Sequence, residues 1–208
     1  MDAVILIRPI QPQDAPEAAV LWRHGLQQTI DAAATEEKRK SYREFFEKHA
    51  KEECSEGGAV GINGTGLIDF FCPPNDACMF VAIHCEGRTS DTSKVVGIVG
   101  VKRGMDSEKF PIDSEEQRVD YNTFSIWKMS VAEESRGRGI GKKLMAKAEE
   151  WAKDQKPSMV DGVAAKKRMR LYTANPIAAA FYTSAVGFVV EEKTDHYGIY
   201  VKDLDIDK

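Results

Sequence analysis

Residues 131–144 read VAEESRGRGIGKKL, and this stretch decides the fold. An apolar, β-rich segment over 124–131 precedes it, and an amphipathic helical pattern follows it. A helix that begins at such a turn presents backbone N–H groups without intrahelical partners, and its dipole favours an anion there. The glycines at positions 137, 139 and 141 place no side chain between a phosphate and the backbone. The stretch therefore predicts a phosphate-binding turn.

Two common phosphate-binding loops do not fit this turn. A Walker loop requires G-x-x-x-x-G-K-[ST] and a dinucleotide loop requires G-x-G-x-x-G, whereas the glycines here follow G-x-G-x-G. The pattern that fits is R-x-x-G-x-G, from Arg136 to Gly141. It resembles the acetyl-CoA pyrophosphate loop of the GNAT superfamily of N-acetyltransferases, and the preceding Met129-Ser130-Val131 resembles that family's fourth strand. A glycine-rich turn without a ligand is the alternative.

A second segment carries the same resemblance. Residues 175–182, followed by Gly187 and Phe188, are similar to the family's N-x-x-A-x-x-F-Y…G-F pattern. Asn175 is suited to cap a helix whose first residue is a proline. Four residues separate Tyr182 from Gly187, where the family usually has three. We expect a bulge or an extended last helical turn to accommodate the extra residue.

The rest of the chain has the element order of that family. Hydrophobic periodicity and turn residues predict the remaining elements. These are a strand over 4–10, helices over 15–33 and 36–53, a loop or short helix over 55–74, strands over 79–85 and 95–101, an excursion over 102–122, and strands over 168–173, 188–193 and 197–204. In the second helix, Tyr42, Phe45 and Phe46 form the expected buried stripe.

The resemblance implies one α/β (α+β) domain over residues 1–208, with substrate-side helices and a loop over 12–76. We expect a mixed, mostly antiparallel central sheet of six to seven strands, flanked by about four helices and splayed between strands four and five. The resemblance is strongest from about residue 78 to the end of the chain.

Composition excludes several classes of protein. The 208 residues carry a net charge of −4, which argues against a nucleic-acid binder. No apolar stretch reaches the length of a membrane span, and no basic leader precedes the short apolar run at the start of the chain. The four cysteines lack metal-ligand spacing, so we expect reduced thiols, no metal, and a cytoplasmic protein, with a nuclear one as the alternative. A homodimer is left open.

The resemblance also implies the site residues. The residues expected to bind acetyl-CoA are Met129, Ser130, Val131, Arg136, Gly137, Arg138, Gly139, Ile140, Gly141, Lys142, Asn175 and Tyr182. Tyr182 is the catalytic candidate, since a phenol with a pKa of about 10 can protonate a leaving thiolate. Packing beneath the cofactor is the alternative for Tyr182, and helix capping alone is the alternative for Asn175.

The general base is not evident in the sequence. Many family members carry a glutamate in strand four where this chain has Ser125, which cannot accept a proton from an ammonium. The remaining candidates are His84, Glu116, Asp120, Tyr121 and His196. We therefore leave this role unassigned.

The expected function is transfer of an acetyl group from acetyl-CoA to a primary amine of a small molecule or amino-acid-like substrate, by direct attack in a ternary complex. The chain has no clustered acidic groove of the kind that suits a polycation. A protein lysine or N-terminal acetyltransferase, a catalytically weak CoA-binding sensor and a protein-interaction domain are the alternatives.

Overall fold

The computed structural model describes residues 4–71, 76–85, 93–104, 122–157, 159–160, 163–164, 166–194 and 197–204. Its helices are α1 (Ala15–Asp31), α2 (Glu36–Glu53), α3 (Thr65–Phe71), α4 (Ile140–Asp154) and α5 (Pro176–Phe181). Its strands are β1 (Val4–Pro9), β2 (Ala77–Cys85), β3 (Ser93–Arg103), β4 (Thr123–Val131), β5 (Met159–Val160), β6 (Val163–Ala164), β7 (Lys167–Thr173), β8 (Val189–Lys193) and β9 (Gly198–Leu204).

Seven of these strands form one sheet in the order β1-β2-β3-β4-β7-β9-β8. Neighbouring strands are antiparallel except for β4 and β7, which are parallel. The predicted mixed, mostly antiparallel sheet of six to seven strands is confirmed, and β7 is its fifth strand in chain order. The short antiparallel pair β5–β6 forms a separate two-stranded sheet, which the sequence analysis did not predict.

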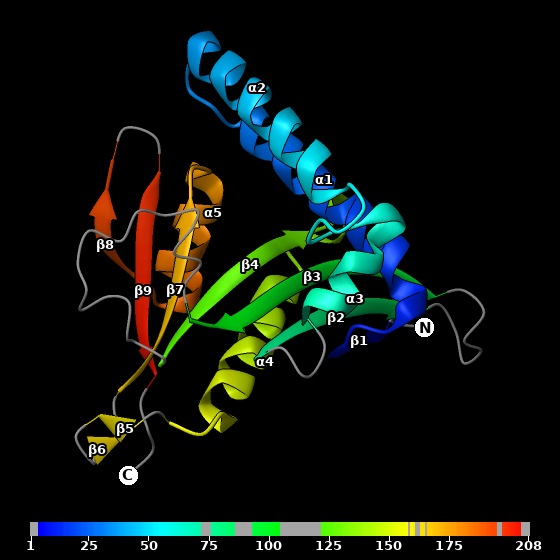
Figure 1. Ribbon diagram of the computed structural model, residues 1–208. Coiled ribbons are helices and arrows are strands. Elements are labelled where there is room, and N and C mark those ends of the chain that lie inside the picture. Colours follow the sequence, from blue (N-terminus) through cyan, green and yellow to red (C-terminus); the bar gives the residue numbers. More distant parts are fainter. Residues whose placement is uncertain are drawn as a thin grey trace.

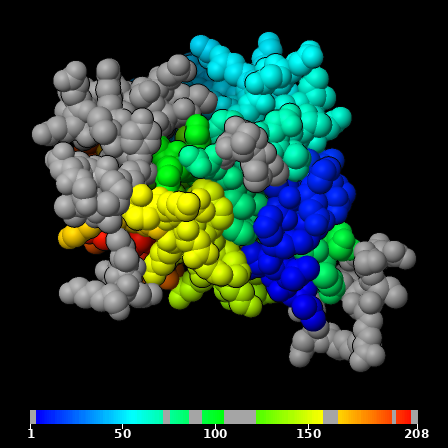
Figure 2. Space-filling view, turned by 60° about the horizontal axis from the view of Figure 1, so that its bottom comes forward, coloured from blue at the N-terminus to red at the C-terminus, as the bar shows by residue number. Residues whose placement is uncertain are grey.

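Helices cover both faces of the sheet, and two glycines of β3 allow them to come close. A Cβ atom on Gly97 would lie 2.9 Å from Leu144 Cδ1 of α4, and one on Gly100 would lie 2.5 Å from Phe71 Cε1 of α3. Helix α4 therefore packs on one face of β3 and α3 packs on the other, where α1 and α2 also lie (Figure 1). Figure 2 shows the end of α4, in yellow, beside the N-terminal segment, in blue.

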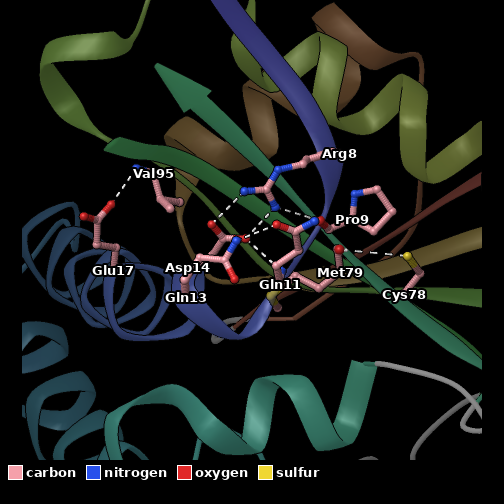
Figure 3. A network of polar contacts seen from close by, with 9 residues as sticks. All are labelled: Arg8, Pro9, Gln11, Gln13, Asp14, Glu17, Cys78, Met79 and Val95. Carbon is pink, nitrogen blue, oxygen red and sulfur yellow. Dashed lines mark hydrogen bonds and ion pairs between the residues drawn. The ribbon is translucent and has the colours of Figure 1, made fainter. Parts of the chain in front are cut away.

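A polar cluster fixes the start of α1 to the sheet (Figure 3). The Arg8 guanidinium of β1 donates to both carboxylate oxygens of Asp14, at 2.6 and 2.9 Å, and the Gln11 N–H donates to the same carboxylate at 2.7 Å. This bonding to Asp14 raises the pKa of Arg8 above its usual value. One turn into α1, the Glu17 carboxylate accepts the Val95 N–H of β3 at 2.6 Å. Helix α1 is thus held by both β1 and β3 as it crosses the sheet.

The expected buried stripe of α2 is wrong. The Phe45 side chain is 63% exposed, while Tyr42 and Phe46 are only partly buried and contact Phe45 or one another edge-on. Glu53, at the last position of the helix, is the one residue of α2 that is buried. Helix α2 packs beside α1 rather than on the sheet, so only a narrow part of its surface meets protein.

Within the described residues, none of the helices has the length and apolar character needed to cross a membrane. The same residues contain no group of three or more histidine, cysteine, aspartate or glutamate side chains placed to hold a metal ion. Cys54, Cys78 and Cys85 are free thiols, and Cys72 lies outside the described residues.

Candidate active site

The sheet splits between β4 and β7. The two strands pair over three residues only, the last pair being Ser125 with Arg170. Beyond it the strands diverge, with β4 running toward α1 and β7 toward the β8–β9 hairpin (Figure 1). Backbone polar groups need a partner when they are shielded from water. The unpaired edges of β4 and β7 can therefore bind an extended ligand laid between them.

Strand β4 also carries a β-bulge beside this split. Because the register with β3 shifts there, Val99 lies opposite two residues, Lys128 and Met129. The φ angle of Lys128 is +51°, in the left-handed region. For a residue other than glycine this conformation costs about 1–2 kcal/mol. A bulge re-aims backbone groups, so β4 carries N–H groups that are not committed to the regular ladder.

The loop after β4 has the geometry of an anion-binding turn. Gly137 and Gly139 adopt φ angles of +74° and +75°, and a Cβ atom on either would meet no atom within 4 Å. Their outer surfaces are open, as close approach of a diphosphate requires. Arg138 and Lys142 are exposed beside them, at the N-terminus of the 15-residue helix α4. The residues present therefore fit a pyrophosphate.

The remaining loop residues have structural contacts. The Arg136 Nε donates to the Val131 carbonyl at 3.2 Å, and its guanidinium also donates to Gln28 of α1. Ile140 is 1% exposed, so its side chain belongs to the core rather than to the surface of the turn. Ser130 is buried against α1, where a Cβ atom on Gly25 would lie 3.2 Å from the Ser130 hydroxyl oxygen.

Gly141 has a packing role that the sequence analysis did not identify. A Cβ atom there would lie 3.1 Å from Phe181 Cζ and 3.4 Å from Met129 Cε. The Met129 side chain therefore points toward α4 and α5, on the sheet face opposite α1. The absence of a side chain at Gly141 brings β4, α4 and α5 together beneath the split.

Helix α5 begins at the predicted cap, and an extended turn, one of the two expected alternatives, follows it. The Asn175 carboxamide oxygen accepts the N–H groups of Ile177 and Ala178, at 2.9 and 3.3 Å, so this residue caps the helix. Residues 182–186 form a π-helical turn, which ends at Gly187 with a φ angle of +85°. A π-helical turn contains one residue more than an α-helical turn, so it accommodates the extra residue after Tyr182.

Tyr182 lies at the start of this turn and is 5% exposed. Its ring packs edge-on against Phe181 and Phe188, and its hydroxyl makes no hydrogen bond to any described residue. Burial raises the pKa of Tyr182 above its usual value. The phenol therefore stays protonated at neutral pH, as a proton donor must.

Comparison with known proteins identifies the family. Residues 32–188 match the model of the acetyltransferase (GNAT) family. This chain belongs to the GNAT acetyltransferase family. No curated protein matches it significantly.

Solved structures share the acetyltransferase fold. A GNAT-family acetyltransferase from Staphylococcus aureus Mu50 is 15% identical with a TM-score of 0.57, over 97% of this chain and 100% of that one. The PaiA N-acetyltransferase of Thermoplasma acidophilum, solved in complex with coenzyme A, is 20% identical with a TM-score of 0.54, over 96% and 99%. Arabidopsis thaliana NAA60, solved with a bisubstrate analogue, is 15% identical with a TM-score of 0.54, over 97% and 100%.

Of the candidates for the general base, the described part of this acetyltransferase contains His84, which does not lie at the split. Ser125 is buried and donates to the Gly104 carbonyl at 2.8 Å, so it has a structural bond. His84 lies in β2, two strands away from β4. The other four candidates, Glu116, Asp120, Tyr121 and His196, lie outside the described residues.

The acetyltransferase instead places a buried ion pair at the bulge, which sequence reasoning missed. The Lys128 ammonium lies 2.6 Å from the Glu53 carboxylate and 4.5 Å from the centre of the Trp22 ring. The two charged side chains are only 4% and 6% exposed. Removing one partner of such a pair costs about 3–5 kcal/mol, because the other charge stays buried. The available signal was a lysine within an apolar strand, which requires a buried partner.

Further aromatic side chains lie on the same sheet face as this ion pair. The Trp127 ring lies 6.3 Å from that of Phe70 in α3, and the Trp22 ring lies 6.1 Å from that of His49 in α2. Across the split, the Arg170 guanidinium of β7 lies 5.4 Å from the centre of the Tyr172 ring. These side chains form the face of the split opposite α4 and α5. We call it the acceptor face.

Proposed function

We propose that this acetyltransferase moves an acetyl group from acetyl-CoA to a primary amine of a small molecule or amino-acid-like substrate, by direct attack in a ternary complex. The observation that carries the proposal is one continuous surface. It comprises the split between β4 and β7, the bulge in β4 and the open glycine turn before α4. Such a surface suits a ligand with an extended arm and a diphosphate at one end.

The donor is held by backbone more than by side chains. The turn from Arg136 to Gly141, with Arg138 and Lys142, binds the pyrophosphate through helix N–H groups and positive charge. The backbone of Met129 and Val131, on the edge of β4 that faces the split, binds the pantetheine arm. Two solved neighbours support coenzyme A as the ligand, the Thermoplasma enzyme in complex with coenzyme A and the Arabidopsis protein in complex with acetyl-CoA.

The reaction forms a C–N bond and breaks a C–S bond. The amine nitrogen attacks the thioester carbonyl carbon, the thiolate leaves, and the nitrogen gives up a proton. An N–H of the β4 bulge polarises the carbonyl. The Tyr182 hydroxyl gives its proton to the departing thiolate, and the proton that the nitrogen gives up after attack restores the Tyr182 phenol. The amine must first lose the proton that it carries at neutral pH, since its pKa is about 10.4. The residue that accepts this proton is unassigned.

The acceptor enters from the face opposite α4 and α5. The described part of that face carries several aromatic rings, and its carboxylate, Glu53, is buried in an ion pair. This composition favours a compact amine over a polycation. A protein lysine or N-terminal amine is the second candidate, and the exposed Phe45 on α2 favours it because a polypeptide could pack there.

The test is thiol release from acetyl-CoA in the presence of amines, amino acids, polyamines and peptides, with acetyl-CoA affinity measured in parallel. Turnover with small amines supports the proposal, and turnover with peptides alone supports the second candidate. Tight binding of acetyl-CoA without turnover on any acceptor would contradict both and point to a CoA-binding sensor. Absence of binding would refute the assigned donor site.

A further inference from the structure

We propose that the buried ion pair between Glu53 and Lys128 holds the β4 bulge in shape and so positions the backbone N–H that polarises the thioester carbonyl. Both are positioning residues, since they act through the backbone of β4. This inference rests on the proposed function and assigns a role to two residues that lie far apart in the sequence.

The conformation of Lys128 is the first argument. The non-glycine residues with positive φ in the described chain are Asn63 and Lys128. Asparagine tolerates the left-handed region, whereas lysine has no such preference. A residue held in an unfavourable conformation needs surrounding contacts that fix it there. The Lys128 side chain makes two such contacts, with Glu53 and with Trp22.

The second argument is that the Lys128 side chain is buried whereas its backbone is exposed. Its side chain is only 4% exposed, although the residue as a whole is partly exposed. The exposed part is therefore the backbone at the bulge. The ammonium group is fixed by the Glu53 carboxylate at 2.6 Å and by the Trp22 ring at 4.5 Å. An anchored side chain with an open backbone is the arrangement required to present a peptide group to a ligand.

The third argument is that the loop after α2 holds Glu53 in place. Its backbone carbonyl accepts the N–H groups of Val60 and Gly61, both at 2.9 Å. A Cβ atom on Gly58 would lie 2.4 Å from the Glu53 carbonyl oxygen, so the glycine allows the loop to pass against the end of α2. The loop after α2 thus wraps around Glu53 and fixes the position of its backbone, from which the side chain reaches Lys128. Because this carboxylate is bound to an ammonium group, it is poorly suited to accept a proton from the substrate.

Three variants separate positioning from chemistry. Glu53→Gln and Lys128→Met each remove one charge but keep a side chain at the strained position. For both we expect kcat to fall by about 100-fold, as when one donor to a developing oxyanion is lost, with little change in the KM for acetyl-CoA. The double variant Glu53→Gln/Lys128→Gly removes both charges of this ion pair, and its glycine adopts positive φ without strain. We expect the double variant to recover kcat to within about fivefold of the wild type.

Recovery in the double variant is the decisive result, because it restores geometry without restoring either charged group. A folded double variant that binds acetyl-CoA but is as slow as the single variants would overturn the inference and assign a chemical role to the pair. Glu150→Gln serves as the matched control, since it removes a carboxylate from an exposed pair with Lys147 at the same 2.6 Å separation. This control should leave kcat unchanged.

If no acceptor supports turnover, that result contradicts the proposed function but not this inference. The inference can then be tested by a structural measurement. We expect crystal structures or amide chemical shifts of Glu53→Gln and Lys128→Met to show the bulge at Met129 relaxed, and those of the double variant to show it retained. Thermal unfolding of each variant shows that it is folded. An unchanged bulge in both single variants would refute the positioning role.

Discussion

Gly139 offers the sharpest test of the pyrophosphate site. It caps α4 with φ +75° and ψ 6°, and a Cβ atom there would meet nothing within 4 Å. Gly139→Asp and Gly139→Asn introduce side chains of nearly the same shape that differ in charge, and both residue types tolerate the left-handed region. The two variants should therefore have similar folded stabilities, each within about 1–2 kcal/mol of the wild type.

Their affinities for acetyl-CoA should differ strongly. A carboxylate about 4 Å from a phosphate charge is repelled by about 4 kcal/mol at an effective dielectric constant of about 20. Since about 1.4 kcal/mol corresponds to a tenfold change in affinity, Gly139→Asp should bind about 1,000-fold more weakly. Gly139→Asn should bind within about tenfold of the wild type, because it adds bulk on an open surface without adding charge.

Isothermal titration calorimetry with acetyl-CoA measures the difference, and thermal unfolding verifies that both variants are folded. The gap between the two affinities should narrow as salt is added, because exposed charges are screened. Equal affinities for the aspartate and asparagine variants would refute the placement of the diphosphate at this turn. A large loss in both would indicate that side-chain bulk, not charge, decides binding.

Four further predictions concern Tyr182, the cap of α5 and the start of α1. Tyr182→Phe should lower kcat by about 100-fold with acetyl-CoA affinity unchanged; equal activity would remove Tyr182 from catalysis. Because burial raises the pKa of Tyr182, the protonated phenol should stabilise the folded state below a pH of about 10, and this stabilisation should be lost as the pH rises further. Alkaline unfolding of the wild type and of Tyr182→Phe would show the difference. Asn175→Ala removes the acceptor of two helix N–H groups and should cost about 1 kcal/mol of unfolding free energy in urea titrations. Asp14→Asn leaves the partly buried Arg8 guanidinium without its carboxylate and should cost about 1–3 kcal/mol by the same measurement; a change near zero would show that the pair does not anchor α1.

The elements that the sequence predicted best are those with local signals. Glycine spacing identified the turn before α4, and an asparagine followed by proline identified the start of α5. Hydrophobic periodicity placed α2 correctly, from Glu36 to Glu53. The extra residue after Tyr182 was also visible in the sequence, although the spacing alone could not distinguish a bulge from the π-helical turn.

The features that the sequence did not predict depend on contacts between distant segments. The aromatic residues of α2 suggested a buried stripe, but burial depends on what lies opposite, and Phe45 faces solvent. The pairing of Glu53 with Lys128 joins residues 75 positions apart, and no local pattern specifies it. The left-handed conformation of Lys128 likewise follows from a register shift against β3, which only the folded sheet imposes.

The narrow junction between β4 and β7 has a consequence for the way this protein opens. Three residue pairs join a four-stranded half of the sheet to a three-stranded half, whereas β2 and β3 pair along nearly their whole lengths. Cooperative units in native proteins tend to separate where few contacts cross between them. In native-state hydrogen exchange, amides of β7, β9 and β8 should therefore exchange through a lower-energy opening than those of β2 and β3. A ligand laid across the split should slow that exchange by joining the two halves into one cooperative unit.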